Sequence, residues 1–200
     1  MKFAAMMTMA AVLGSADWAA GKSGEQKVVA CFEEDGSYLV EAPQARMIAA
    51  ELFHSAGVKL ELRTGRRSCE AQRDREIVVS LSMNTPPDLR PGALAYARPF
   101  EGVHIQVFYD RIANGAHSRQ LRPYLLAYVI VHEITHVLEG IDRHSDSGIM
   151  KANWDAREHD LMLTSKLVFA EEDVALIHKG LAARAARHAS ETLVAAAELR

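Results

Sequence analysis

The sequence lacks several features that would direct it to particular classes of protein. Its 200 residues contain no internal repeat and no block of like charge, and aromatic residues make up only 6%. The 23 Lys and Arg residues are scattered and are outnumbered by 26 Asp and Glu, so we expect no basic face and no nucleic-acid partner. Hydrophobic residues still reach 49%, enough for one ordinary globular domain with a buried core.

Long hydrophobic runs are also missing, so no transmembrane segment is expected. The apolar run from Phe3 to Leu13 is too short to span a bilayer. It follows a single Lys and precedes small residues, which is typical of a secretory signal peptide. We therefore predict a signal peptide over residues 1–20 and a secreted or periplasmic protein. A buried N-terminal helix is the alternative interpretation.

Only two cysteines are present, Cys31 and Cys69. In the oxidising compartment that export implies, a single pair favours one disulfide, which would stabilise the fold by about 3 to 4 kcal/mol on the chain-entropy estimate. Two buried thiols are the alternative. Two cysteines so far apart in the chain do not form a zinc signature.

Hydrophobic periodicity divides the chain into alternating strands and helices. The strands are predicted over 27–34, 58–63, 77–82, 93–99 and 102–110. The helices are predicted over 42–57, 119–139, about 154–161 and from about 169 onward, the first with an apolar stripe that includes Met47. This order predicts an α/β (α+β) domain over residues 25–182, with a mixed twisted sheet of about five strands, a buried helix and a C-terminal helix. Residues 183–200 are Ala-rich and are expected to form a helical extension.

The helix predicted over 119–139 contains the candidate catalytic and metal-binding residues. It is apolar nearly all round, which indicates burial, yet it contains His132, Glu133 and His136 in the pattern His-Glu-x-x-His. Residues four apart project from one helix face, so both imidazoles can reach one zinc ion, and Glu133 can act as general base on a water there. A bound metal would offset the desolvation cost of these side chains. A structural pair of core histidines is the alternative.

A catalytic zinc site has three protein ligands, and three residues could supply the third. His144 follows Gly140, the predicted end of the helix, where the chain is free to turn back under the metal. Asp142 lies closer to the helix, and Glu158 lies on the next predicted helix. The spacing alone leaves the choice open.

The segment HEITHVLEGIDRHSDSGIM resembles the metzincin metallopeptidases, whose signature is His-Glu-x-x-His-x-x-Gly-x-x-His followed by a methionine-containing turn. Within that clan, RHSDSGIM is most similar to the matrixin form. The resemblance implies that His132, His136 and His144 hold one catalytic Zn²⁺, with Glu133 as general base and Met150 as the structural turn residue. The family spacing would put the third ligand at Asp142, which stays as the alternative. The longer spacing is similar to that of small predicted secreted bacterial proteins.

This resemblance implies a secreted zinc metalloendopeptidase with a zincin-like fold. An extended peptide or protein substrate would pair with an edge strand, here residues 93–99, and the chain is expected to act as a monomer. The alternative function is a non-catalytic exported zinc-binding or scaffold protein that keeps the fold. Glu133 argues against it, because a scaffold needs no carboxylate beside its first ligand.

Overall fold

The computed structural model describes residues 26–33, 40–65, 67, 69, 76–97 and 103–198. The signal peptide predicted over residues 1–20 lies outside these ranges. The elements, in chain order, are β1 (Gln26–Phe32), α1 (Ala42–Ser55), β2 (Val58–Thr64), β3 (Ile77–Ser82), β4 (Ala95–Ala97), β5 (His104–Phe108), α3 (Tyr109–Gly115), α4 (Leu121–Glu139), α5 (Ala156–Leu163) and α6 (Glu171–Glu198).

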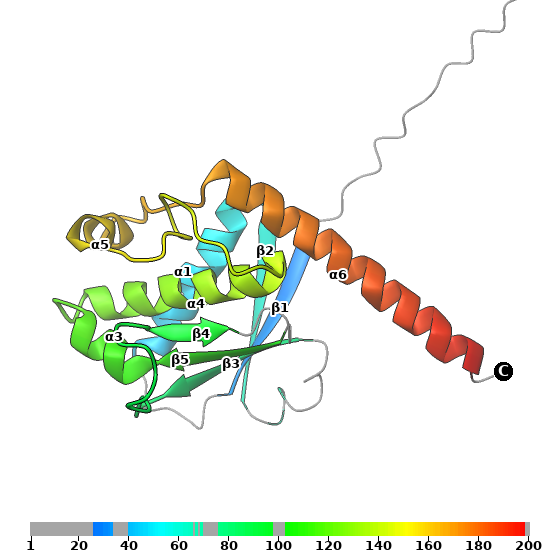
Figure 1. Cartoon of the computed structure of the whole chain (residues 1–200), viewed down its shortest axis with the longest axis horizontal. Coiled ribbons are helices and arrows are strands. Elements are labelled where there is room, and N and C mark those ends of the chain that lie inside the picture. The colour runs from blue at the N-terminus through cyan, green and yellow to red at the C-terminus, as the bar shows by residue number, and fades with distance from the viewer. Residues whose placement is uncertain are drawn as a thin grey trace, which may run out of the picture.

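The five strands form one mixed sheet in the order β2-β1-β3-β5-β4, as Figure 1 shows. The pairs β1/β2, β1/β3 and β3/β5 are parallel, and β4 is antiparallel to β5 at the edge of the sheet. The prediction of a mixed sheet of about five strands with a buried helix and a C-terminal helix is confirmed.

The core lies between the sheet and the packed pair α1 and α4. Successive side chains of a strand point to opposite faces, and the buried members of one face join the side chains of these two helices in a single apolar cluster. The strand residues in that cluster are Val28, Ala30, Phe32, Val58, Leu60, Ile77, Val79, Ile105 and Val107. The sheet therefore supports α4, the helix with the His-Glu-x-x-His pattern, from below.

Two local predictions were wrong. Met47 is 58% exposed, because the buried face of α1 is formed by Ala45, Ile48, Ala49 and Leu52 instead. The strand predicted to reach Asp110 ends at Phe108, where α3 begins.

The early end of β5 has a physical cause in its neighbour. The last residue of β3, Ser82, pairs with Phe108, so β5 has no partner on that side beyond this point. Asp110 then accepts hydrogen bonds from the backbone N–H and the hydroxyl of Thr85, at 3.1 and 2.6 Å. These bonds hold the first turn of α3 against the loop that follows β3.

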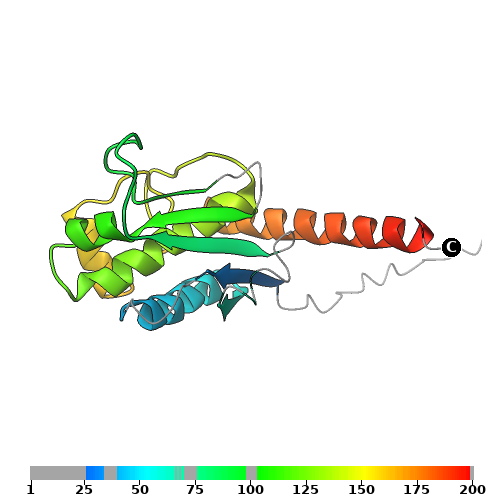
Figure 2. The same ribbon diagram turned by 90° about the horizontal axis from the view of Figure 1, so that it is seen from below.

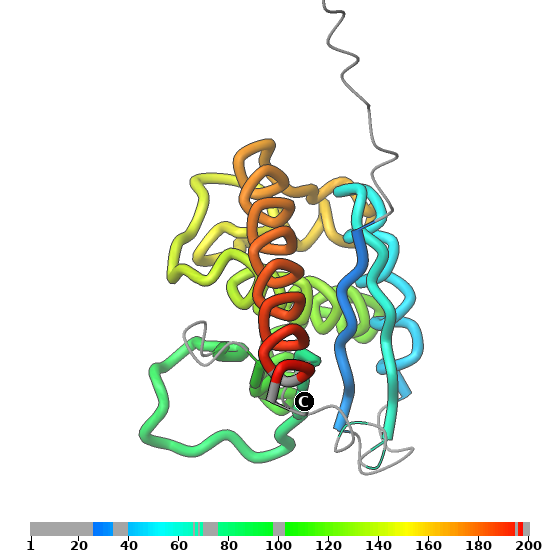
Figure 3. The backbone as a smooth tube through the Cα atoms, turned by 90° about the vertical axis from the view of Figure 1, so that its right-hand side faces the viewer, coloured from blue at the N-terminus to red at the C-terminus, as the bar shows by residue number. Residues whose placement is uncertain are grey.

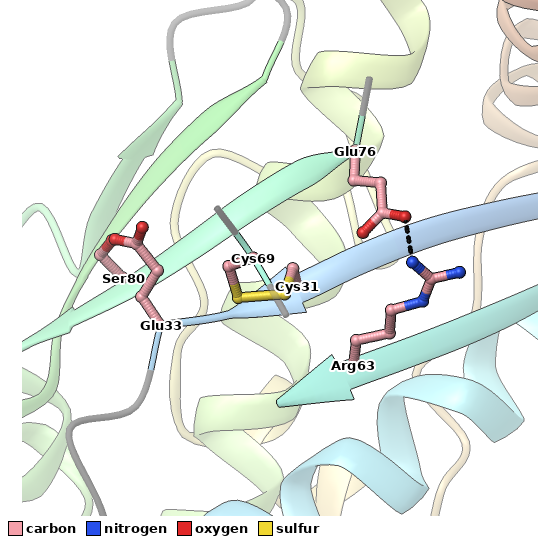
Figure 4. Close-up of a disulfide and its surroundings, with 6 residues drawn as sticks. All are labelled: Cys31, Glu33, Arg63, Cys69, Glu76 and Ser80. Atoms are coloured by element: carbon pink, nitrogen blue, oxygen red, sulfur yellow. Dashed lines mark hydrogen bonds and ion pairs between the residues drawn. A yellow bond between two sulfur atoms is a disulfide. The ribbon is translucent and has the colours of Figure 1, made fainter. Parts of the chain in front are cut away.

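Cys31 and Cys69 form a disulfide with a Cα–Cα distance of 5.3 Å (Figure 4). Cys31 lies in β1, an interior strand of the sheet, and both cysteines are fully buried. The Arg63–Glu76 ion pair, 2.6 Å from Nη1 to Oε1, joins β2 to the residue before β3 in the same region. The disulfide therefore ties Cys69, which lies between β2 and β3 in the chain, to an interior strand of the sheet.

The last helix, α6, runs without a break for 28 residues. Its first half packs on the end of α4, and its second half extends past the sheet, as Figure 2 shows. Viewed along this helix, β1 and β2 run side by side next to it (Figure 3). Across the described ranges, no helix combines the length and apolar character needed to cross a membrane.

Candidate metal centre

Helix α4 positions two of the predicted ligands. Its end is fixed by Gly140, which adopts a left-handed conformation (φ 68°) and donates its backbone N–H to the carbonyl of His136. All residues from Leu125 to Leu138 are buried. His132 and His136 are therefore largely buried, with exposed fractions of 7% and 6%.

The two rings are oriented by backbone carbonyls. Nδ1 of His132 lies 2.8 Å from the carbonyl oxygen of Ile149, and Nδ1 of His136 lies 3.3 Å from that of Ile141. A carbonyl oxygen only accepts, so each Nδ1 must carry the proton. The two Nε2 atoms, 3.0 Å apart, then present lone pairs to each other. A cation between them would remove this repulsion, so the donor set fits a metal ion.

Burial keeps both rings neutral, which is the form that binds metal. Desolvation lowers the pKa of His132 to about 3, and the neighbouring His136 and His144 act in the same direction. The pKa of His136 is lowered as well, first by burial and then by His144. Neither ring therefore competes for a proton near neutral pH.

His144 joins this pair from the irregular segment after α4. Its ring centroid lies 5.3 Å from that of His132 and 4.9 Å from that of His136. The ligand atoms of the three histidines all lie within 4.8 Å of one another. In the part of the chain that the structure describes, no other group of three His, Cys, Asp or Glu side chains meets this condition.

The two other candidates for the third ligand, Asp142 and Glu158, are not part of the histidine cluster. Asp142 is exposed and is not a member of the histidine group, although its charge affects the pKa of His136. Glu158 accepts from the backbone N–H of Asp155 at the start of α5 and pairs with Lys151 at 2.7 Å. Its carboxylate is therefore engaged in the structure of α5.

A tight turn at Gly148 lies against the histidines. Gly148 has a φ of 77°, and a Cβ there would lie 2.4 Å from the carbonyl oxygen of Val168, so only glycine fits. The turn presents the Ile149 carbonyl to His132 and buries Met150 completely. Trp154 packs edge-on against the His132 ring, at 5.5 Å between centroids.

Glu133 is placed against the edge of the sheet. It is only 9% exposed, and burial raises its pKa to about 7. A hydrogen bond from the backbone of Ala97 in β4 opposes this shift, whereas the charge of Asp142 adds to it. A carboxyl group with a pKa near 7 is well matched to proton transfer at neutral pH.

Strand β4 leaves some of its backbone groups unpaired with β5. The hydrogen bond from Phe108 N–H to the carbonyl of Leu94, 2.8 Å long, marks these two residues as a hydrogen-bonded pair. In an antiparallel ladder such pairs alternate, so Tyr96 also pairs with β5, while the N–H and C=O groups of Ala95 and Ala97 point away from it. An extended peptide could add to this edge beside Glu133.

Sequence reasoning missed the residues that hold the His144 segment. Arg143 and Ser145 both contact Asp173 in the first turn of α6. No local pattern links residues 143 and 173, so the sequence carries no signal for this contact.

The comparisons with known proteins concern the fold. No protein-family model matches the sequence, and no curated protein matches it. Solved structures do match, among them archaemetzincin from Methanopyrus kandleri, with 13% identity, a TM-score of 0.56 and coverage of 81% of this chain and 98% of that one. A zinc-dependent peptidase from Methanocorpusculum labreanum (strain Z) matches with 14% identity, a TM-score of 0.50 and coverage of 75% and 99%. The chain thus shares its fold with archaemetzincin and with a zinc-dependent peptidase, and it contains a three-histidine cluster that can hold a metal ion.

Proposed function

We propose that this chain is a secreted zinc metalloendopeptidase of the metzincin type. One observation carries the proposal: a cluster of three histidines, a buried carboxylate and the edge strand β4 meet at one place. His132, His136 and His144 would hold a single Zn²⁺, and Met150 would support them from the turn below. The fold shared with archaemetzincin and with a zinc-dependent peptidase supports the same conclusion.

The mechanism assigns separate roles to the protein groups. Zinc, when bound, polarises a carbonyl group and lowers the pKa of water toward neutrality. Glu133, whose pKa is about 7, accepts the proton of the attacking water and returns it to the leaving amine. The backbone groups of Ala95 and the carbonyl of Ala97 would hold the substrate in an extended form, while the Ala97 backbone N–H donates to Glu133. No covalent intermediate with the protein is required.

Two observations are compatible with export. The structure contains a disulfide, a bond that persists in oxidising compartments. The sequence has the pattern of a signal peptide over residues 1–20. We propose that the domain acts outside the cytoplasm.

The first experiment separates the peptidase from a zinc-binding scaffold. The purified protein should contain about one zinc ion per chain by elemental mass spectrometry, in the wild type and in Glu133→Gln alike. A mixture of unstructured peptides, with products identified by mass spectrometry, should be cleaved by the wild type about 10²- to 10⁴-fold faster than by Glu133→Gln. Glu51→Gln, at an exposed position of α1, is the matched control and should retain full activity.

Each possible failure has a distinct meaning. Equal cleavage by the wild type and Glu133→Gln would exclude the proposed mechanism. Zinc without any cleavage would favour the scaffold function. A chain that takes up no zinc would leave His132 and His136 as buried helix residues.

The third ligand is tested by two further substitutions. We expect His144→Ala to weaken zinc binding by at least about tenfold and Asp142→Ala to have little effect, because the Asp142 carboxylate stands outside the histidine cluster. Zinc affinities measured by competition with a chelator decide between them. The opposite ranking would assign the third position to Asp142.

A further inference from the structure

His144 is the least constrained of the three histidines. His132 and His136 lie on a helix, and the Nδ1 of each donates to a backbone carbonyl. His144 lies in an irregular segment and is exposed. Among the residues that the structure describes, no group forms a hydrogen bond with its ring. Apart from its contacts with the other two rings, its position therefore depends on the backbone on either side of it.

Both neighbours of His144 are bound to the same carboxylate oxygen. Nη2 of Arg143 donates to Oδ1 of Asp173 at 2.5 Å, and the hydroxyl of Ser145 donates to the same atom at 2.6 Å. The exposed fraction of Asp173 is 0%, so water does not compete for these bonds. Charge-assisted bonds of this kind are stronger than neutral ones.

Asp173 is itself fixed by the helix that carries it. Its second oxygen, Oδ2, accepts the backbone N–H of Ala170, the residue just before α6, at 3.2 Å. Ser145 is fixed on its other side, since its backbone N–H donates to the carbonyl of Met150 at 2.8 Å. The carboxylate therefore connects the first turn of α6 with the segment that carries His144 and, through Ser145, with the turn below the histidines.

We propose that Asp173 is a positioning residue for the metal centre. By holding Arg143 and Ser145, it keeps the ring of His144 directed at His132 and His136, although it touches neither metal nor substrate. This inference rests on the proposed function, because it assumes that His144 is a ligand. It makes the affinity for zinc depend on the docking of α6, a helix outside the motif.

The test is a double-mutant cycle on zinc affinity, measured by chelator competition on the full domain. Asp173→Asn should weaken zinc binding by at least about tenfold. If Asp173 acts through His144, it should cause no further loss in a His144→Ala background. A general structural role would instead weaken binding equally in both backgrounds.

Asp173→Asn disturbs a buried ion pair and could fail to fold. A second variant therefore tests the inference independently. Ser145→Ala leaves the Arg143–Asp173 pair in place and should also weaken zinc binding, again only when His144 is present. Glu172→Gln is the matched control, because Glu172 contacts Arg143 at 3.4 Å from a side chain that is 70% exposed. Its zinc affinity should stay within about twofold of the wild type.

Cobalt(II) offers a readout that does not depend on activity. The visible spectrum of the cobalt form of Asp173→Asn should shift toward that of His144→Ala, because both lose an ordered third ligand. Wild-type affinity and spectrum in both Asp173→Asn and Ser145→Ala would overturn the inference and leave the proposed function standing. Absence of zinc binding in the wild type would overturn both, and zinc binding without hydrolysis would overturn only the peptidase.

Discussion

Glu139, the last residue of α4, is a carboxyl group in surroundings that do not favour its charge. Burial raises its pKa to about 7, and the charges of Asp173 and Glu172 add to that effect against the opposing charge of Arg143. Neither of its carboxyl oxygens has a hydrogen-bonding partner within the described structure. The folded protein therefore retains a proton here at pH values where the unfolded chain has released it.

The sign of the resulting pH dependence follows from proton linkage. Between the ordinary pKa of 4.5 and the folded value of about 7, the folded state binds more protons, so the free energy of unfolding falls as the pH rises. We predict that Glu139→Gln removes this loss and raises the melting temperature at pH 8 but not at pH 4. Thermal unfolding of the metal-free wild type and the metal-free variant at both pH values measures this difference in melting temperature.

The comparison of Glu139→Gln with the wild type isolates the effect of Glu139, because the histidines are the same in both proteins. Glu51→Gln, on the exposed face of α1, should leave the melting temperature unchanged at both pH values. An equal gain from Glu139→Gln at pH 4 and pH 8 would show that Glu139 is not the titrating group.

At the scale of elements, the crossing of α4 and α6 depends on Gly180. A Cβ at this position would lie 1.8 Å from the carbonyl oxygen of Leu138 and 2.7 Å from its carbon. Both atoms belong to the backbone of α4 and cannot move aside like a flexible side chain. The two helices can approach this closely only because residue 180 has no side chain.

We predict that Gly180→Ala destabilises the protein by about 1 to 3 kcal/mol, in the manner of an overpacked core. The sign of the change in stability tests the close approach, because alanine exceeds glycine in helix propensity by about 1 kcal/mol. Without the close approach, Gly180→Ala would therefore stabilise α6. Urea denaturation measures the difference. Gly115→Ala is the control: nothing lies within 4 Å of its Cβ position, so its effect should be small. Stabilisation by Gly180→Ala would contradict the close crossing.

At the same scale, the sequence predicted the elements well where periodicity was strong. The buried helix around the motif ends at Glu139 as expected, because Gly140 provides the left-handed residue that ends it. The strand expected through Asp110 ends at Phe108 instead, because its partner β3 ends opposite that residue. A strand needs a hydrogen-bonding partner, and the residues of one strand do not determine where its partner ends.

At the scale of the whole molecule, the disulfide joins segments that the chain separates by 38 residues. We predict that the Cys31→Ala/Cys69→Ala double variant loses about 3 to 4 kcal/mol of stability, because the unfolded chain regains the freedom of the opened loop. Urea denaturation of the oxidised protein, the reduced protein and the variant measures this loss. The reduced protein should resemble the variant, and equal stability of all three would exclude a stabilising role.

By itself, the sequence determined the layout of strands and helices and the pair His132 and His136, because both depend on periodicity within a few turns of one helix or strand. Tertiary structure alone brought the ring of His144, rather than the carboxylate of Asp142, to that pair, and put the backbone of Ala97 against Glu133. It also joined Asp173 to the neighbours of His144. These contacts depend on how segments far apart in the chain pack against one another, and no local spacing encodes that packing.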